Sequence, residues 1–421
     1  MAVPEPPATR LIRGARLFGA PGVGEGELGW VLTAGDRIAA LGPGVPEGSG
    51  SMGALGAMEP GEVVEPVEVV EAEGLILAPG FVDQHCHGGG GVDVTQGADA
   101  AREVARTHLL HGTTTLIASL VSAAPSALIS QIEALLPLVD DGTFAGIHLE
   151  GPWLSTAHCG AHAPELLTTP RTELVNELLQ VAGTRLSMVT LAPELEGAIE
   201  AVERLAEASV VVALGHSRAD AATVRRAVDA GARVATHLFN GMPSMTHREP
   251  GIAGALLRDP RVTVELIADG VHVHPDLIAI VVAAAGPDRV SLVTDAMAAA
   301  GAPDGSYRLG RLAVEVVDRV ARLADSGALA GSTLTMDRAV ARVSGTLAGW
   351  TEPGSVESGC IEPGSAEPLA GALRMASRTP ARVLGLSDRG ELSVGSRADL
   401  VVLDAEGGVR RVLRAGDWVS R

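Results

Sequence analysis

The middle of the chain alternates between short apolar segments and longer segments with apolar residues on one helical face. A short apolar run bounded by glycine, proline or polar residues is typical of a buried strand, and an apolar stripe at the helical period is typical of an amphipathic helix. Eight segments fit the strand pattern, at residues 76–84, 113–121, 144–150, 187–192, 210–215, 232–237, 262–268 and 290–295. Helical patterns fill most of the intervals, at residues 98–110, 126–139, 171–181, 196–208, 218–230 and 274–285.

This alternation predicts an α/β fold with a parallel sheet. Strands joined mostly by helical crossovers fit a (β/α)8 TIM barrel, and a doubly wound open sheet is the alternative. Polar side chains that are suited to ligate or catalyse follow several of the strands. Because closure brings the carboxyl ends of all the strands around one centre, this arrangement favours the barrel.

Both ends of the chain carry a different, strand-rich pattern. Alternating apolar residues and Gly-Pro turns mark residues 8–47, 62–71 and 390–418. We predict that the ends pair into a small β-sandwich domain, residues 1–74 plus 386–421, beside a barrel domain, residues 75–385. Residues 332–347 and 368–379 have the pattern of later helices. Residues 48–62 and 350–368 show no period, so we interpret the first as a loop and the second as a flexible insertion.

Composition and charge exclude several classes of partner. The net charge of −19 argues against nucleic acid, because phosphate backbones need clustered cations. No apolar run approaches the roughly 20 residues that span a bilayer, and the start of the chain lacks the pattern of a signal peptide, so we expect a cytoplasmic protein without membrane contact.

Three widely spaced cysteines do not predict a disulfide framework. All of the 32 basic residues are arginine, and lysine is absent.

The candidate chemistry lies at the strand ends. Glu150 ends the apolar run before Gly151-Pro152, and a carboxylate at such a buried position is costly unless it binds a proton or a metal. His85 and His87 share one face at the end of the first strand, and His216 and His237 follow two neighbouring strands. Each histidine alone has a plainer interpretation as a hydrogen-bonded core or turn residue. Together with a carboxylate they indicate a catalytic metal site, because such sets leave a position for water.

Asp295, which follows the last strand, is the natural general base for such a site. A carboxylate opposite the metal can take a proton from water and later return it to a leaving amine, although capping a helix is the plainer role. His148 lies two residues before Glu150, one layer deeper, and we interpret it as a hydrogen-bonded interior residue. Cys86 points away from the His85 and His87 face and has a structural role in this interpretation.

The sequence points less clearly to residues that contact the substrate than to the metal ligands. Asn240 and Gly241 follow His237, and backbone N–H groups in such a turn can bind phosphate. Arg248 in the next loop either holds an anion or pairs with a glutamate, and the sequence alone leaves both open. His162 and His272 are further polar candidates. The glycine run at residues 88–91 is not a dinucleotide fingerprint, because no G-x-G-x-x-G spacing opens a helix there.

Taken together, a set of blocks in consistent order resembles the N-acetylglucosamine-6-phosphate deacetylases of the amidohydrolase superfamily. The resemblance extends from about residue 75 to residue 403, and the set is specific although single blocks are not. The blocks are PGFVDQHCHG (79–88), GIHLEGPWL (146–154), LGHS (214–217), THLFNGM (236–242), HREPG (247–251), ADGVHVHP (268–275), LVTDAM (292–297) and LAGSTLTM (329–336).

The resemblance implies a metal-dependent hydrolase that removes acetate from N-acetylglucosamine 6-phosphate. By position, Glu150, His216 and His237 match the ligands of the main metal, and His85 and His87 match places where some members bind a second metal. The resemblance further implies that Asp295 is the acid and base and that His162 polarises the amide carbonyl. It implies that Asn240 and the Gly241 backbone contact the phosphate. It also implies that Arg248 and His272 contact the phosphate across a dimer interface. Gly241 stands where alanine is common in the family.

Several alternatives remain at this point. A relative that acts on a cyclic amide or urea would need a carbamylated lysine, which this lysine-free chain cannot supply. N-acetylgalactosamine 6-phosphate is an alternative substrate that the same residues could process. A non-catalytic metal-binding barrel is the alternative from another class, but neither sensing nor scaffolding requires a base such as Asp295. We expect one or two divalent metals per subunit, with zinc as the first candidate and iron, manganese or cobalt as alternatives.

Overall fold

The structure is a computed structural model of the chain, and it describes residues 8–44, 68–349 and 367–420. The predicted loop at residues 48–62 lies outside the described residues. Residues 350–366 of the predicted insertion also lie outside them. The last two residues of that insertion are described, and they begin helix α9 (Glu367–Ala376).

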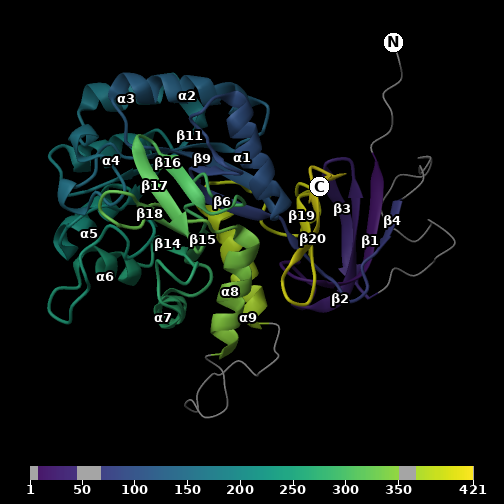
Figure 1. Cartoon of the computed structure of the whole chain (residues 1–421). Coiled ribbons are helices and arrows are strands. Elements are labelled where there is room, and N and C mark those ends of the chain that lie inside the picture. The colour runs from purple at the N-terminus through teal and green to yellow at the C-terminus, as the bar shows by residue number, and fades with distance from the viewer. Residues whose placement is uncertain (1–7, 45–67, 350–366, 421) are drawn as a thin grey trace.

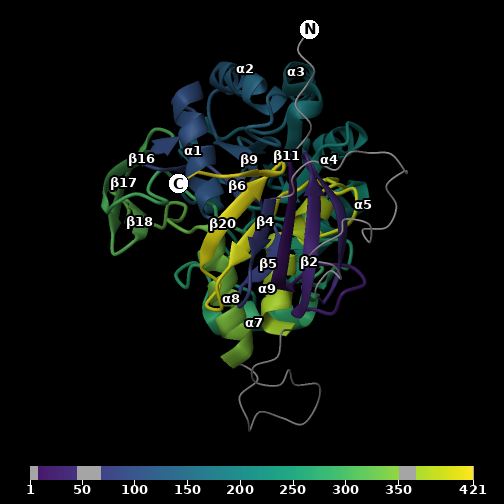
Figure 2. The same ribbon diagram turned by 90° about the vertical axis from the view of Figure 1, so that its right-hand side faces the viewer.

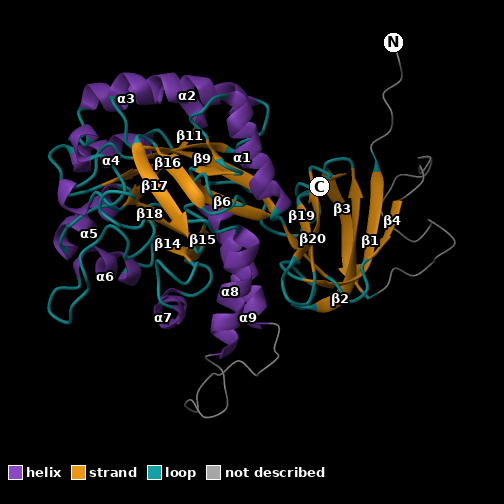
Figure 3. Ribbon diagram, in the orientation of Figure 1, coloured by secondary structure: helices purple, strands orange, loops and turns teal. Residues whose placement is uncertain are grey.

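Parallel strands form a barrel, and helices surround it (Figures 1 and 3). The fold predicted from the sequence is confirmed, because one eight-stranded sheet follows the chain order without crossovers between non-neighbours. A parallel bridge between Cys86 and Ala296 joins the first strand to the segment after the last, which closes the barrel. The barrel strands are β6 (Phe81–Cys86), β9 (Thr113–Val121), β10 (Gly146–Glu150), β11 (Leu186–Leu191), β12 (Val211–Leu214), β13 (Val234–Ala235), β14 (Thr263–Ile267) and β15 (Val290–Val293).

The helices occupy the intervals between the strands and then follow the last one. Their buried residues recur at the helical period, as Ala198, Ala201, Val202 and Leu205 do on α4, so each helix covers the barrel with one apolar face. Helix α6 was not predicted, because its eight residues lie in an interval without a clear stripe. The helices are α1 (Ala98–Leu110), α2 (Pro125–Asp140), α3 (Thr172–Ala182), α4 (Ala198–Glu207), α5 (Ala221–Ala230), α6 (Gly251–Arg258), α7 (Pro275–Ala285), α8 (Met336–Gly349), α9 and α10 (Arg378–Val383).

The strand predicted over residues 76–84 is divided at Gly80. Its first half is β5 (Ile76–Pro79), which pairs with strands from both chain ends, and its second half is the first barrel strand, β6. The Gly80 N–H donates to the Asp399 carbonyl at 2.8 Å, and a Cβ at this position would lie 2.2 Å from Thr114 Oγ1. Glycine therefore allows the chain to pass closely between the two sheets.

Other boundaries also differ from the sequence pattern. The helix predicted over residues 368–379 is two helices, α9 and α10, separated at Ser377, whose hydroxyl donates to the Leu373 carbonyl. The helix predicted from residue 332 starts at Met336, because Ser332 is bridged to Ala296 beside the barrel. The strand predicted over residues 232–237 is only Val234–Ala235, and the chain then turns to present His237.

Strands from both chain ends form a second sheet beside the barrel, with the yellow strands from the C-terminus on one side and the purple strands from the N-terminus on the other (Figure 2). β5 joins the two groups, since it pairs with β1 on one side and with β19 on the other. The limits 1–74 plus 386–421 and 75–385 for two domains stay a prediction. The sheet contains β1 (Thr9–Leu17), β2 (Glu27–Ala34), β3 (Arg37–Pro43), β4 (Glu68–Glu71), β5, β19 (Leu400–Leu403), β20 (Val409–Arg414) and β21 (Asp417–Trp418).

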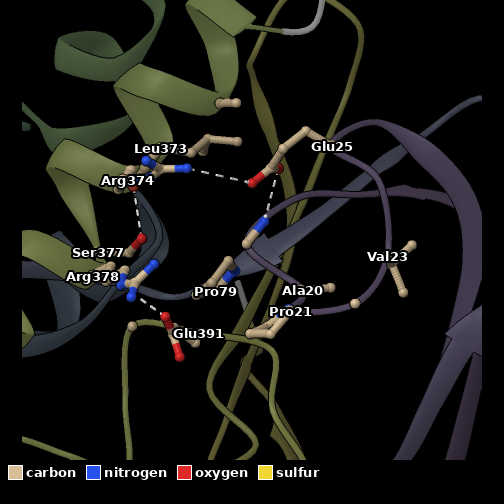
Figure 4. Close-up of a pocket in the computed structure, with 14 residues that line it drawn as sticks. Ala20, Pro21, Val23, Glu25, Pro79, Leu373, Arg374, Ser377, Arg378 and Glu391 are labelled. Atoms are coloured by element: carbon tan, nitrogen blue, oxygen red, sulfur yellow. Dashed lines mark hydrogen bonds and ion pairs between the residues drawn. The ribbon is translucent and has the colours of Figure 1, made fainter. Parts of the chain in front are cut away.

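A cavity of about 340 Å³ lies between this sheet and helices α9 and α10 (Figure 4). Arg374 and Arg378 project into it from the helix side. Arg374 lies 3.9 Å from Glu25, and Arg378 Nε lies 2.8 Å from Glu391 Oε1. These ion pairs are partly exposed, so each contributes at most about 1 kcal/mol to stability.

A short β hairpin and a three-stranded sheet follow the first and the last barrel strand. β7 (Gly88–Gly89) and β8 (Val92–Asp93) follow the first barrel strand. β16 (Gly305–Leu309), β17 (Leu312–Val317) and β18 (Val320–Leu323) form an antiparallel sheet that the sequence analysis did not predict. No helix among the described residues is long and apolar enough to cross a membrane.

Candidate active site

Glu150 lies at the centre of a cluster of histidines. Its Oε1 atom is 3.1 Å from His216 Nε2 and 3.0 Å from His237 Nε2, and its Oε2 atom is 3.2 Å from His87 Nε2 and 3.3 Å from His162 Nε2. Burial alone would raise the pKa of the Glu150 carboxyl, but the neighbouring histidines hold it well below its ordinary value. The carboxylate that ends β10 is therefore ionised and contacts the histidines that the sequence analysis singled out.

The two histidines at the end of β6 complete the cluster. His85 Nε2 and His87 Nε2 are 3.2 Å apart, and Asp295 Oδ1 lies 3.6 Å from the first and 3.4 Å from the second. Although burial lowers it, hydrogen bonds to Asp295 and Glu150 raise the pKa of His87 to about 9. Burial raises the pKa of Asp295, but the charge of His85 and the hydrogen bond from His87 lower it to about 2. Asp295 is thus ionised and able to accept a proton.

Contacts on the outer side of each ring fix its orientation. His85 Nδ1 donates to Glu265 Oε2 at 3.2 Å, His87 Nδ1 to the Ser119 carbonyl at 3.0 Å, and His216 Nδ1 to the His158 carbonyl at 2.8 Å. In the neutral form of each of these three rings Nδ1 carries the proton, so Nε2 could offer its lone pair to a metal ion. His237 Nδ1 is buried without a hydrogen-bond partner among the described residues.

This donor set fits a divalent metal ion. His216 Nε2 and His237 Nε2 lie 3.0 Å apart and both lie within 3.1 Å of Glu150 Oε1, so three possible ligand atoms converge on one position. Imidazole nitrogens and carboxylate oxygens are ligands for zinc and for neighbouring transition metals. Three groups among the described residues meet the spacing that a metal requires, and two of them belong to this cluster: His85 with His87 and Asp295, and Glu150 with His162 and His216.

The backbone at three of these residues is strained. His216, His237 and Asp295 have φ values of 46°, 25° and 47°, in the left-handed region that side chains other than glycine seldom adopt. Each is the second residue after the end of a barrel strand, where the chain turns into a loop. The strain is retained because it turns these side chains toward the barrel axis, as is common at functional sites.

His162 approaches the cluster from the loop after β10. The Ser122 N–H donates to His162 Nδ1 at 3.3 Å, so the proton of the neutral ring lies on Nε2, which faces Glu150 Oε2. Burial lowers the pKa of His162, which keeps the ring neutral. The ring therefore presents its Nε2–H to the centre as a hydrogen-bond donor.

The predicted phosphate contacts have different surroundings. Asn240 Nδ2 donates to the carbonyls of His237 and Leu238, which places the amide directly beside the cluster. Gly241 has a φ of 62°, and a Cβ there would lie 2.7 Å from His216 Nδ1, so glycine leaves room for the metal-facing ring. Arg248 is exposed in the loop before α6.

His272 is held by Asp269 in the loop after β14. Its Nδ1 lies 2.7 Å from Asp269 Oδ2, and its backbone N–H donates to Asp269 Oδ1 at 2.8 Å. Burial lowers the pKa of His272, but the bond to Asp269 and the nearby charge of Asp295 raise it above its ordinary value. His272 therefore lies close to the Asp295 of its own chain.

Sequence reasoning missed two buried carboxylates that support the site. Glu265 accepts from Gln84 Nε2 at 2.7 Å, from His85, and from the His237 backbone N–H at 3.1 Å. Asp83 accepts from the Thr294 hydroxyl at 2.5 Å and from the backbone of His85. Both lie inside apolar strands, and a carboxylate in a wholly buried strand is the signal that could have revealed them.

Two interpretations of interior residues agree with the structure. His148 is fully buried and bonded to Ser119 Oγ at 3.0 Å and to Thr190 Oγ1 at 2.9 Å, one layer below the cluster. Cys86 points outward from the barrel, and its thiol lies 3.2 Å from Nε2 of the buried His108 on α1.

His108 should make the stability of the protein depend on pH. Burial lowers its pKa from 6.5 to about 4, so between these values the unfolded chain binds a proton that the folded protein does not. Stability is then lost as the pH falls from 6.5 toward 4. We expect this residue to account for about 2 kcal/mol of lost stability at pH 5.

Denaturant unfolding of the wild type and of His108→Gln at pH 7.5 and pH 5 measures this contribution. The wild type should lose about 2 kcal/mol more than the variant between these pH values, because the variant lacks the titrating group. Equal losses in both proteins would show that His108 does not titrate as described.

Comparisons with known proteins agree with this geometry. The sequence profile of the amidohydrolase family matches residues 76–419. An N-acetylgalactosamine-6-phosphate deacetylase of Escherichia coli O157:H7 is 38% identical over 374 residues, which cover 87% of this chain and 93% of the relative. An N-acetylglucosamine-6-phosphate deacetylase of Danio rerio is 38% identical over 366 residues, which cover 83% of this chain and 85% of the relative.

Solved structures are similar over nearly the whole chain. A variant of N-acetyl-D-glucosamine-6-phosphate deacetylase from Mycobacterium smegmatis, in complex with N-acetyl-D-glucosamine-6-phosphate, is 40% identical with a TM-score of 0.85, covering 98% of this chain and 100% of that one. N-acetylglucosamine-6-phosphate deacetylase from Thermotoga maritima is 29% identical with a TM-score of 0.80, covering 98% and 99%. With a family match over most of its length and relatives above 30% identity, this chain belongs to the amidohydrolase family.

Proposed function

We propose that this protein is an N-acetylglucosamine-6-phosphate deacetylase, which hydrolyses the acetamide of N-acetylglucosamine 6-phosphate to glucosamine 6-phosphate and acetate in amino-sugar catabolism. The observation that carries this function is the buried set of Glu150, His216 and His237 with the ionised Asp295 beside it. The relatives in the comparisons that share most of the chain carry the names of deacetylases of phosphorylated amino sugars.

Glu150, His216 and His237 would hold the main metal, because their ligand atoms face one another at 3.0 to 3.1 Å. A divalent metal ion in this position supplies Lewis-acid activation of the amide carbonyl and of the attacking water. Zinc suits these ligands best, and iron, manganese and cobalt are alternatives.

A second metal position is supported by the other oxygen of Glu150. Oε2 lies 3.2 Å from His87 Nε2, which in turn lies 3.2 Å from His85 Nε2. His85, His87 and Glu150 would therefore hold a second ion. With lysine absent from the chain, Glu150 is the carboxylate that could serve both metal positions.

Asp295 is the proposed acid and base. Its ionised carboxylate would take a proton from the attacking water as the new C–O bond forms. It would then deliver that proton to the amide nitrogen as the C–N bond breaks, so that the leaving amine departs neutral. The low pKa of Asp295 means that the carboxyl is ionised before the reaction, as a general base must be.

His162 is proposed to stabilise the negative charge that develops on the carbonyl oxygen. Its Nδ1 is occupied by the Ser122 N–H, so Nε2–H is available as a donor. A donor that is already aimed at the developing oxyanion costs no reorganisation during the reaction.

Replacing His162 should lower kcat much more than it changes KM. We expect His162→Gln to lose about 100-fold in kcat, the range seen when one oxyanion donor is removed. Steady-state kinetics and metal analysis measure the effect, with His158→Gln from the same loop as the control. A loss below about fivefold, or an equal loss in the control, would remove His162 from this role.

Asn240, the Gly241 backbone, Arg248 and His272 are proposed to contact the phosphate. Asn240 and Gly241 adjoin His237 and His216, and His272 lies near Asp295, so these groups border the proposed metal site. Arg248 is exposed, which agrees with a proposed contribution to the site of a second subunit in a homodimer. The cytoplasmic location also stays a prediction from the sequence.

N-acetylgalactosamine 6-phosphate is a second candidate substrate. The observation in its favour is the Escherichia coli relative, whose name gives that substrate and which is 38% identical over 93% of its length. Initial rates of acetate release from both phosphorylated sugars, at equal low concentrations, compare the kcat/KM values directly. The proposal predicts the higher rate with the glucosamine epimer, and a higher rate with the galactosamine epimer would reverse the assignment.

A further inference from the structure

The cavity between the terminal sheet and helices α9 and α10 has no part in the proposed reaction. Its volume of about 340 Å³ lies within the range of ligand pockets, roughly 300 to 1,000 Å³. Its wall combines charged and apolar side chains, and the apolar ones are Ala20, Pro21, Val23, Pro79, Ala370 and Leu373. The cavity is therefore large enough for a compact metabolite and offers it both polar and apolar contacts.

The charged side chains that line the cavity balance one another. Arg374 and Arg378 project into it from the helices, while Glu25 lies in the loop between β1 and β2 and Glu391 in the segment between α10 and β19 (Figure 4). Glu25 faces Arg374, and Glu391 faces Arg378. Each end of the cavity thus has one positive and one negative group, and the charges of the lining sum to zero.

These pairs leave hydrogen-bonding capacity for a ligand. Arg374 lies 3.9 Å from Glu25 Oε1 and 3.7 Å from Oδ2 of Asp288, which is not a lining residue, and both distances exceed that of a hydrogen bond. Arg378 lies 2.8 Å from Glu391 through Nε, which is only one corner of its planar fork. The two arginine side chains are 32% and 54% exposed, so a ligand can reach them from solvent.

Gly390 fixes the arrangement of Glu391 and Arg378. Its φ is 85°, and a Cβ there would lie 2.9 Å from Arg378 Cα and 2.9 Å from the Ser377 carbonyl oxygen. Only glycine allows the chain to pass this close to the start of α10. The backbone therefore holds the carboxylate of Glu391 beside the guanidinium of Arg378 before any ligand binds, which lowers the cost of binding.

We propose that this cavity binds a small zwitterion, which carries one anionic group and one ammonium group, as α-amino acids and amino-sugar phosphates do. The anionic group is bound by Arg374 and Arg378, because guanidinium forks bind carboxylate and phosphate oxygens in pairs. The ammonium group is bound by the Glu391 oxygen that does not face Arg378.

The balance of charge selects the zwitterion. A molecule with only an anionic group also meets the two carboxylates, and a molecule with only an ammonium group meets the two guanidinium groups. Like charges therefore disfavour both. This inference does not depend on the proposed function.

Equilibrium dialysis of the metal-loaded protein against labelled ligands counts the molecules bound per chain. Glucosamine 6-phosphate and leucine represent the two kinds of zwitterion, and glucose 6-phosphate and glucosamine each lack one of the two charges. We expect a zwitterion to occupy the cavity at least about tenfold more tightly than either singly charged sugar, since each charged hydrogen bond contributes about 1.5 to 3 kcal/mol. The zwitterion that binds identifies the source, and binding of neither would overturn the inference.

Two double variants locate the bound zwitterion. Arg374→Gln/Arg378→Gln should bind one zwitterion fewer per chain than the wild type. The control Arg185→Gln/Arg204→Gln removes two comparably exposed arginines that pair with carboxylates elsewhere, and it should bind as the wild type does. Equal binding by the cavity variant and the wild type would overturn the inference, and an equal loss in the control would assign the effect to net charge.

Glu391→Gln tests the selection by charge and serves if the double variant fails to fold. This change leaves the lining with a net positive charge, so glucose 6-phosphate should bind several-fold more tightly than to the wild type. Unchanged binding of glucose 6-phosphate would contradict the role of Glu391.

Acetate release, measured on the same preparations, separates this inference from the proposed function. The cavity variant should release acetate within about twofold of the wild-type rate, because its changes lie outside the proposed active site. If the wild type releases no acetate but binds one zwitterion more than the cavity variant, the function fails and the cavity site stands. If it releases acetate and both proteins bind equally, the cavity site fails and the function stands.

Discussion

Asp295→Asn should bind metal normally and lose nearly all turnover. The asparagine keeps the size and the carbonyl oxygen of the side chain but cannot accept a proton. Asp295 Oδ1 lies 3.4 Å from His87 Nε2 and 3.6 Å from His85 Nε2, so the substitution preserves the shape of the cluster. General acid and base catalysis contributes about 10² to 10⁴-fold, and both proton transfers are assigned to this residue, so we expect a loss of at least about 1,000-fold in kcat.

Metal content and kcat, measured on the same preparation, distinguish the two ways in which this variant could lose activity. Full metal content with the expected loss assigns the proton transfers to Asp295. Residual kcat within about tenfold of wild type would show that another group, or water alone, moves the proton. A variant without metal would instead make Asp295 a required ligand.

Glu150→Gln should abolish metal binding, and activity with it. The carboxylate contacts four histidine Nε2 atoms at 3.0 to 3.3 Å and carries the negative charge that balances a cation in a buried site. An amide of the same size lacks this charge and turns an N–H donor toward some of these atoms. We expect metal affinity to fall by more than about 100-fold, since replacing a group that only supports a ligand already costs 10- to 100-fold.

Competition with a coloured chelator measures this affinity. Glu265→Gln is the comparison variant, for which we expect a smaller loss of metal affinity. Glu265 accepts hydrogen bonds from His85 and from the His237 backbone N–H and is not a proposed ligand. Its loss should fall within about 10- to 100-fold, below that of Glu150→Gln. Equal metal affinity in Glu150→Gln and wild type would contradict the central place given to Glu150.

The sequence pattern predicts the barrel well because buried parallel strands are continuous apolar runs. The residues of β10, β14 and β15 are all buried, and the predicted helices between them have apolar stripes. The type and the order of these strands and helices can therefore be predicted from the sequence. The division of the first predicted strand at Gly80 could not be predicted. It depends on a contact of the chain with Asp399 and Thr114, which are remote in sequence.

The candidate site was predictable where side chains follow strand ends. Glu150, His216 and His237 could be assigned to one place because the carboxyl ends of parallel strands converge. Glu265 and Asp83 could not, since each lies within a strand and its role depends on which strand lies beside it. The tautomer of His162 also depends on a partner, Ser122, in another loop.

Acetate release by the metal-loaded protein is the most direct test of the proposed deacetylase activity. N-acetylglucosamine 6-phosphate and plain N-acetylglucosamine are supplied side by side, with chelated protein and Asp295→Asn as controls. We expect rapid acetate release from the phosphorylated sugar and far slower release from the plain sugar. Chelated protein and Asp295→Asn should release almost no acetate. Wild-type protein that is fully loaded with metal and releases no acetate from the phosphorylated sugar would contradict the proposed activity.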